Sequence, residues 1–234
     1  MTLEIALIGL GRFGRTIASL ILQNPAYRLA SAIVRTNPGK DLGSLLNLPP
    51  TGILLTSSRT CPCDVYIDVS LPEALSDNLE AALAAQKPIV IGTTGLSPSQ
   101  LDSIQHASQT IPIFQSPNFS LGMALLRKLA ALTSSHFHPD AHIDLIETHH
   151  VQKKDAPSGS ALLLAKEIEK PVSIHSLRTG KIIGEHTLIF NTAEERITLS
   201  HEAHSRDAFA RGALAAAQFI SSQPPGLYNM NHLF

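Results

Sequence analysis

The densest group of reactive side chains lies in residues 147–160, where the sequence reads ETHHVQKKDAPSGS. Two imidazoles, His149 and His150, and two ammonium groups, Lys153 and Lys154, fall within six consecutive positions. An imidazole can carry a proton near neutral pH, and an ammonium group can stabilise developing negative charge. A lone histidine is more often structural than catalytic, and the chain holds 11 histidines, so chance pairs are common, but the adjacent lysines and turn favour a catalytic role here.

The same segment predicts a binding place for an anion. Ser158 suits the N-cap of a helix, and the first backbone N–H groups of that helix, at Gly159 and Ser160, would point towards a bound carboxylate. With positive charge from His150 or Lys153, the residues Ser158, Gly159 and Ser160 predict a carboxylate site. A capped helix without a ligand is the alternative interpretation. A metal is not expected, because the side chains of adjacent residues in a strand point in opposite directions.

A second candidate site follows the apolar residues 4–9, which predict a strand leading into the sequence GLGRFG and then a helix. In such a unit Gly9 permits the tight turn, Gly11 lets the backbone approach a pyrophosphate, and Gly14 lets the helix pack closely on the sheet. An ordinary tight turn is the alternative. The expected cofactor-binding residues of this turn are Gly9, Leu10, Gly11, Arg12, Phe13 and Gly14.

The residues after the second expected strand favour NADPH over NADH. An NAD site usually has an acidic residue about 20 positions after the last glycine. Here that position is Val34, followed by Arg35. A guanidinium suits a 2′-phosphate, so Arg35, helped by Lys40, favours NADPH, unless Arg35 is only a solvated surface residue.

Two further loops follow expected strands and could approach the nicotinamide, or could be plain turns. The first loop contains Gly92, Thr93 and Thr94, and the second contains Ser116, Pro117, Asn118 and Phe119.

Strands and helices alternate in the first half of the chain, which predicts an α/β fold with a Rossmann parallel sheet. The later segments predict a second, α+β domain with an open mixed sheet. The expected domains are 1–117 plus 206–234 for the dinucleotide and 118–205 for substrate and oligomerisation. The expected strands are 4–9, 28–34, 64–69, 88–91, 111–114, 142–148, 172–177, 181–190 and 196–200, and the expected helices are 16–22, 72–85, 97–107, 120–132, 158–169 and 207–220.

The overall composition favours small-molecule chemistry. The 234 residues include 18 Lys plus Arg and 19 Asp plus Glu, so no large field of one sign attracts nucleic acid or an anionic membrane. The apolar N-terminal run is too short for a membrane span and has no basic leader, which predicts a cytoplasmic protein. Cys61 and Cys63 are poorly placed for a disulfide and are too few for structural zinc.

Together these segments resemble the dihydrodipicolinate reductases of bacterial lysine and diaminopimelate synthesis. The most specific match is the signature of two histidines, a lysine and Asp-Ala-Pro-Ser-Gly. The resemblance implies a homotetramer that reduces a small dicarboxylate, 4-hydroxy-tetrahydrodipicolinate, to tetrahydrodipicolinate with NADPH or NADH. It also implies that His149 donates a proton, that Lys153 assists, and that His150, Gly159 and Ser160 bind carboxylates. The matching stretches are 9–15, 67–70, 72–73, 91–95, 118–120, 147–160, 184–187 and 201–212.

The chain departs from this family pattern at three places, one of which is the pair Gln152 and Lys154, where other members have variable or basic residues and to which no role is given. Relatives often carry an acidic residue where Val34 stands, and many have a longer connection than residues 170–177, which bears on part of the tetramer interface. Two other functions stay open. A dehydrogenase acting on an aspartate semialdehyde needs a nucleophilic cysteine, and none follows Cys63. A nucleotide-sensing module would have no need of the cluster at 149–160.

Overall fold

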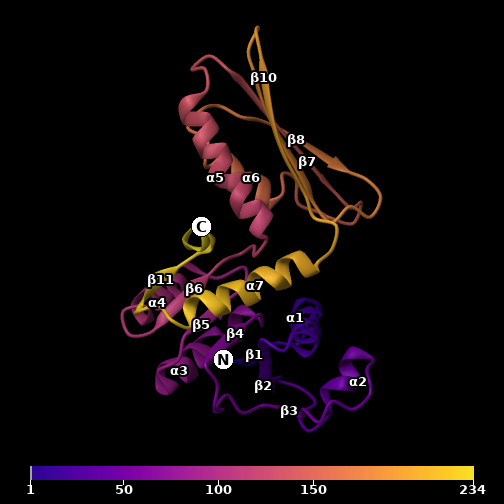
Figure 1. Cartoon of the computed structure of the whole chain (residues 1–234), viewed down its shortest axis with the longest axis vertical. Helices are drawn as coiled ribbons and strands as arrows, with labels where there is room; N and C mark the ends of the chain where they lie inside the picture. Colours follow the sequence, from indigo (N-terminus) through magenta and orange to yellow (C-terminus); the bar gives the residue numbers. More distant parts are fainter. Residues whose placement is uncertain (1) are drawn as a thin grey trace. The chain divides into compact units, whose positions relative to one another are not determined.

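The computed structural model describes residues 2–234 and divides, by the contacts between residues, into two compact units (Figure 1). Unit 1 contains the chain up to Phe119 and again from Phe209 to Phe234, and unit 2 contains Ser120–Ala208. Across residues 2–234, no helix is both long and apolar enough to cross a membrane.

Unit 1 is built on a seven-stranded parallel sheet with the order β11-β6-β5-β4-β1-β2-β3. Its central strands are short runs of buried apolar residues, as expected where helices cover both faces. The expected Rossmann sheet is confirmed. The strands are β1 (Leu3–Ile8), β2 (Tyr27–Ile33), β3 (Leu55–Thr56), β4 (Val65–Asp68), β5 (Ile89–Ile91), β6 (Pro112–Gln115) and β11 (Gly226–Tyr228).

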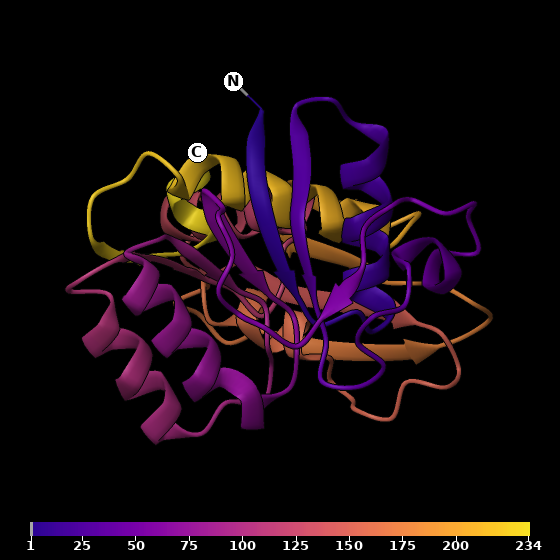
Figure 2. The same cartoon turned by 90° about the horizontal axis from the view of Figure 1, so that it is seen from below.

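Helices lie on both sides of this sheet, with α3 and α4 on one side and α1 and α7 on the other (Figure 2). Because side chains alternate along a strand, Ala6 and Ile8 of β1 face the first pair, where they join Leu79 and Ile104 in one apolar core. The helices are α1 (Arg12–Gln23), α2 (Leu42–Leu46), α3 (Leu75–Ala85), α4 (Pro98–Ala107) and α7 (Asp207–Ile220), with 3₁₀ turns at Pro72–Ala74 and Met230–Leu233.

Unit 2 is a four-stranded mixed sheet with the order β10-β9-β7-β8. Helices α5 and α6 lie along the same side of it (Figure 1), and Leu126 and Leu164 pack there against Leu145 and Phe190. β7 pairs in parallel with β8 and antiparallel with β9, so the expected open mixed sheet is confirmed. The elements are α5 (Leu121–His136), β7 (His142–His149), α6 (Gly159–Ala165), β8 (Ser173–Arg178), β9 (Glu185–Asn191) and β10 (Arg196–Glu202).

Some element limits differ from the expectation. The helix expected over 158–169 ends at Ala165, because the N–H groups of Glu167 and Ile168 bond to carbonyls only three residues back and Pro171 cannot continue a helix. The strand expected over 181–190 begins at Glu185, after a turn. Elements α2, β3 and β11 were not predicted, since two to five residues are too few for a periodic signal.

Candidate active site

The glycine turn between β1 and α1 has three glycines in three different environments. Gly9 has a φ of +93°, and a Cβ there would lie 2.8 Å from the Ser70 nitrogen. A Cβ at Gly14 would lie 1.9 Å from the Gly9 carbonyl oxygen, so the helix start and the turn touch. At Gly11, nothing lies within 4 Å of the Cβ position, and no side chain caps α1. The backbone at Gly11 is therefore open to a ligand.

A cavity of about 820 Å³ in unit 1 joins this turn to the residues after β2. Gly9, Leu10 and Gly11 contribute to its lining, together with Arg35 and Lys40. Pockets of this size hold small molecules and cofactors. Five residues that the sequence predicted to bind the cofactor therefore line the same cavity.

Two further arginines, Arg15 and Arg59, line the same cavity and were missed in the sequence. Arg59 donates to the Asn78 side chain at 2.7 Å and pairs with Asp77 at 3.2 Å. It lies in an irregular loop between β3 and β4, where no motif points to it. With Arg35 and Lys40, four cations line the cavity, and its lining residues include no Asp or Glu.

The two expected nicotinamide loops follow β5 and β6, which are neighbours in the sheet. Their carboxyl ends therefore lie at one sheet edge, as ligand sites in such sheets do. Phe119 is buried and stacks on Phe114 with ring centroids 6.1 Å apart, so its side chain serves the core. The Thr93 hydroxyl is buried without a hydrogen-bond partner, which fits a polar ligand group. Several expected residues lie outside the lining of the 820 Å³ cavity: Arg12, Phe13, Gly14, Gly92, Thr93, Thr94, Ser116, Pro117, Asn118 and Phe119.

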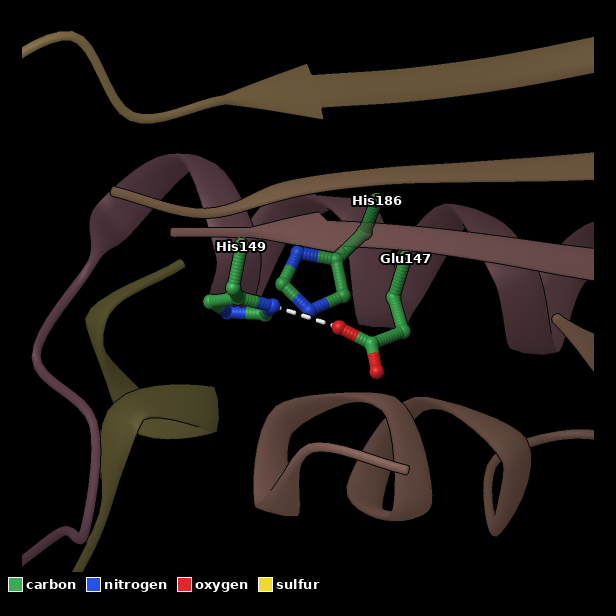
Figure 3. Close-up of side chains that lie close together, drawn as sticks. All are labelled: Glu147, His149 and His186. Carbon is green, nitrogen blue, oxygen red and sulfur yellow. Dashed lines mark hydrogen bonds and ion pairs between the residues drawn. The ribbon is translucent and has the colours of Figure 1, made fainter. Parts of the chain in front are cut away.

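In unit 2, strand register brings four polar side chains together. Glu147 and His149 are two apart on β7, so both point to the same face. The antiparallel pairing with β9 sets His186 opposite Glu147, and the parallel pairing with β8 sets Arg178 opposite His149. Figure 3 shows Glu147 and His149 on one strand, with the His186 ring beside them.

Glu147 is fully buried and its carboxylate is saturated with hydrogen bonds. Arg178 donates from Nη1 to Oε2 at 3.0 Å and from Nη2 to Oε1 at 2.7 Å, and the Ser158 N–H donates to Oε1 at 3.2 Å. Burial alone would raise the pKa of Glu147, but the hydrogen bonds from Arg178, Ser176 and His149 lower it to about 2. Glu147 is therefore an anion at neutral pH.

His149 is tied to this anion through Nδ1, which hydrogen-bonds to Glu147 Oε2 (Figure 3). Because an ionised carboxylate only accepts hydrogen bonds, Nδ1 carries the hydrogen and Nε2 is the nitrogen that exchanges a proton. Burial lowers the pKa of His149 and the Glu147 contact raises it, with a net decrease. A Cβ at Gly184 would come within 3.1 Å of Nε2, so glycine there leaves this nitrogen room.

His186 packs edge to face against His149 with ring centroids 5.3 Å apart, and its Nε2 lies 3.3 Å from the Ser158 hydroxyl. Burial, together with the charge of His149, lowers the pKa of His186 to about 4. His186 is therefore neutral at pH 7 and supports the His149 ring without adding charge.

One ligand atom from each of Glu147, His149 and His186 lies within 4.8 Å of the others, the spacing of a possible metal site. However, both carboxylate oxygens of Glu147 already bind Arg178, and a divalent ion would be repelled by that guanidinium. The group is better described as a hydrogen-bonded acid–base cluster.

The loop after β7 already holds a carboxylate, that of Asp155. Lys153 Nζ lies 2.9 Å from Asp155 Oδ2, and the Gly159 N–H also donates to this carboxylate, so both contacts lower the pKa of Asp155. Ser158 caps α6 as expected, accepting from the Ala161 N–H at 3.2 Å. His150 Nδ1 is buried without a partner. Thus Lys153 and the Gly159 N–H, which were expected to bind a substrate carboxylate, bind the Asp155 carboxylate of their own loop.

Known proteins similar to this chain cover both units. Residues 3–119 match the family model described as Dihydrodipicolinate reductase, N-terminus, and residues 122–234 match the model for its C-terminus. The 4-hydroxy-tetrahydrodipicolinate reductase of Pseudoalteromonas atlantica is 38% identical over 97% of each chain. That of Alkaliphilus oremlandii is 44% identical over 73% of this chain and 79% of its own.

Solved structures share the fold of the whole chain. A dipicolinate-bound dihydrodipicolinate reductase from Paenisporosarcina sp. TG-14 has a TM-score of 0.85, with 24% identity and all of both chains covered. An amine dehydrogenase from Mycobacterium smegmatis has a TM-score of 0.73, with 10% identity over 99% of this chain and 96% of its own.

Proposed function

The chain belongs to the dihydrodipicolinate reductase family of NAD(P)H-dependent oxidoreductases in lysine and diaminopimelate biosynthesis, and on that premise we propose that it reduces 4-hydroxy-tetrahydrodipicolinate to tetrahydrodipicolinate. The observation that carries this proposal is His149, a buried imidazole whose Nδ1 is occupied by Glu147 and whose Nε2 is left to exchange a proton.

Loss of water from the substrate, in which the hydroxyl leaves with a proton from the neighbouring ring carbon, gives a conjugated cyclic imine. A bound nicotinamide would supply the hydride that reduces the conjugated carbon. The product of hydride addition is an enamine that must take up a proton. His149 delivers this proton from Nε2, since Nδ1 is bound to Glu147. Lys153, whose charge acts on His149, stabilises the negative charge that develops and assists departure of the hydroxyl group.

The cofactor in this proposal is held by unit 1, with NADPH preferred over NADH. The cavity beside the glycine turn carries Arg35, Lys40, Arg15 and Arg59 and no acidic lining residue, which suits a 2′-phosphate rather than two free ribose hydroxyls. The backbone of Gly9 to Gly14 would hold the pyrophosphate. The loops 92–94 and 116–119 would hold the nicotinamide, where the buried Thr93 hydroxyl lacks a partner.

The substrate in this proposal is held by unit 2. Its carboxylates would contact His150, Lys153, Gly159 and Ser160, and two of these groups, Lys153 and the Gly159 N–H, now bind the Asp155 carboxylate. Dipicolinate, the ligand of the similar Paenisporosarcina reductase, is a six-membered ring with two carboxylates, as is the proposed substrate. This likeness supports the assignment.

We also propose a cytoplasmic homotetramer. In unit 2 one sheet face is covered by α5 and α6, while the other carries half-buried Ile146 and Ile189 with exposed Thr198 and Ser200. A β-branched, partly apolar sheet face of this kind suits packing against another copy. Sedimentation analysis of the purified protein tests this, and a monomer at micromolar concentration would contradict it.

The activity is tested by the oxidation of NADPH in the presence of the dihydrodipicolinate precursor. We expect turnover with the wild type, competitive inhibition by pyridine-2,6-dicarboxylate, and a fall in kcat of about 10² to 10⁴-fold in His149→Gln. His136→Gln, at the exposed end of α5, is the control and should keep full activity. A wild type that binds NADPH but never oxidises it with this substrate would favour the nucleotide-sensing alternative.

A further inference from the structure

Arg178 ends β8 and is placed by the strand register directly beside His149. Besides its two bonds to Glu147, its guanidinium donates to the carbonyl oxygens of Leu177 and Asp155. The turn that follows is bonded back to β7, since the Thr179 N–H donates to the His149 carbonyl at 2.9 Å. The end of β8 therefore holds both the backbone of His149 and the Glu147 carboxylate that binds the His149 ring.

Resting on the proposed reductase function, we propose that Glu147 and Arg178 are positioning residues for the proton transfer. The Glu147 carboxylate fixes the tautomer and orientation of the His149 ring so that Nε2 delivers the proton, and Arg178 holds that carboxylate in place.

The charges around His149 support this role. The groups that face it are Glu147 from its own strand, His186 from β9, Arg178 from β8 and Lys153 from the following loop. Burial, Lys153 and Arg178 all disfavour the protonated ring, and among residues 2–234 the anion that favours it is Glu147. Without Glu147, His149 would hold its proton only at lower pH.

Stability alone does not explain the Glu147–Arg178 pair. Removing two charges from water costs about as much as their attraction returns, and replacing such pairs by apolar residues is often neutral or stabilising. A carboxylate is, in contrast, well suited to fixing a histidine tautomer, because it accepts the Nδ1 hydrogen and can never donate to that nitrogen.

The first test is Glu147→Gln, measured as kcat against pH. We expect kcat at pH 8 to fall about 10- to 100-fold, with the alkaline limb displaced to lower pH, because the ring loses the anion that keeps it protonated. The KM for NADPH should stay unchanged. Glu167→Gln is the matched control, since Glu167 also pairs with an arginine, Arg127, in unit 2 but away from this cluster. It should leave both kcat and the pH profile unchanged.

A second readout does not depend on turnover. The ¹⁵N shifts of His149 in the wild type should report the tautomer with hydrogen on Nδ1, and Glu147→Gln should mix the tautomers. If the unpaired Arg178 left by Glu147→Gln prevents folding, Glu147→Gln with Arg178→Met removes both charges. Its alkaline limb should be displaced in the same direction but less far, because Arg178 also disfavours the protonated ring. Arg178→Lys keeps a charge but loses the paired bonds, and should give an intermediate kcat.

The proposal would be overturned by a folded Glu147→Gln with wild-type kcat and pH profile, or by a wild-type His149 with its hydrogen on Nε2. A wild type with no reductase activity would instead refute the proposed function, and the tautomer measurement would still test the anchoring of His149.

Discussion

Asp155 occupies, within its own loop, the groups that the substrate is proposed to use. Its carboxylate binds Lys153 Nζ and the Gly159 N–H, while its side chain is more than half exposed. A bound dicarboxylate must therefore displace it. This internal competition is modest, because an exposed ion pair is worth only about 0.2–1 kcal/mol.

We expect Asp155→Asn to bind pyridine-2,6-dicarboxylate up to about five-fold more tightly than the wild type, since the competing charge is gone and a free energy of 1 kcal/mol corresponds to about that factor. Isothermal titration calorimetry measures it, with Asp140→Asn, in the exposed loop before β7, as the control. Weaker binding would mean that Asp155 instead holds Lys153 ready for the substrate.

In the proposed function, the preference for NADPH depends mainly on Arg35. A charge-assisted hydrogen bond to a 2′-phosphate contributes about 1.5–3 kcal/mol. Arg35→Ala should therefore raise the KM for NADPH by about 10- to 100-fold and leave the KM for NADH nearly unchanged. Arg28→Ala is a suitable control, because Arg28 lies at the other end of β2 and pairs with Glu4. Equal effects on both cofactors would remove the specific role of Arg35.

At the scale of elements, the β1–α1 turn allows the proposed cofactor binding to be tested separately from the packing of the helix on the sheet. A Cβ at Gly14 would collide with the Gly9 carbonyl, so Gly14→Ala must displace backbone. A Cβ at Gly11 meets nothing, but it would stand where a pyrophosphate approaches.

We therefore expect Gly14→Ala to lower the Tm of the ligand-free protein, with a loss of about 2–4 kcal/mol, and Gly11→Ala to leave that Tm unchanged while weakening NADPH binding about ten-fold or more. Thermal unfolding and titration with NADPH measure the two effects. A Gly11→Ala variant with normal affinity for NADPH would show that the turn does not hold the cofactor.

Local patterns predicted the elements that have local causes. The glycine turn, the Ser158 cap and the alternating strands all depend on residues that are close together in the sequence. The acid–base cluster depends on strand register instead: Glu147 meets His186 and His149 meets Arg178 only after β7, β8 and β9 have paired. The sequence places Arg178 between the expected strands 172–177 and 181–190, and it places Glu147 in the matching stretch 147–160 without a role. Arg59 likewise reaches the 820 Å³ cavity of unit 1 only when residues distant in the sequence come together.

At the scale of the whole molecule, acid should destabilise unit 2 through His186 first. In the unfolded chain His186 takes up a proton as the pH falls below its ordinary pKa of 6.5. In the folded protein burial lowers the pKa of His186 to about 4, so protonation requires a lower pH. The unfolded state therefore binds more protons in that window, and stability is lost as the pH falls from about 6.5 towards about 4. The lowered pKa values of His149 and His201 act in the same direction. Glu147, lowered to about 2 from 4.5, contributes as the pH falls from about 4.5 towards about 2, so it overlaps only the acid end of that window.

We expect the free energy of unfolding to be on the order of 2–3 kcal/mol lower at pH 4.5 than at pH 7 because of His186 alone. Urea unfolding at the two pH values, followed by hydrogen exchange in each unit, measures the loss and should locate it in unit 2. His186→Phe keeps a ring of similar size but cannot titrate, so its difference between the two pH values should shrink by that amount. His204→Asn, at a largely exposed position, should retain the wild-type difference. If His186→Phe keeps the full loss, the imidazole is not the acid-sensitive group of this unit.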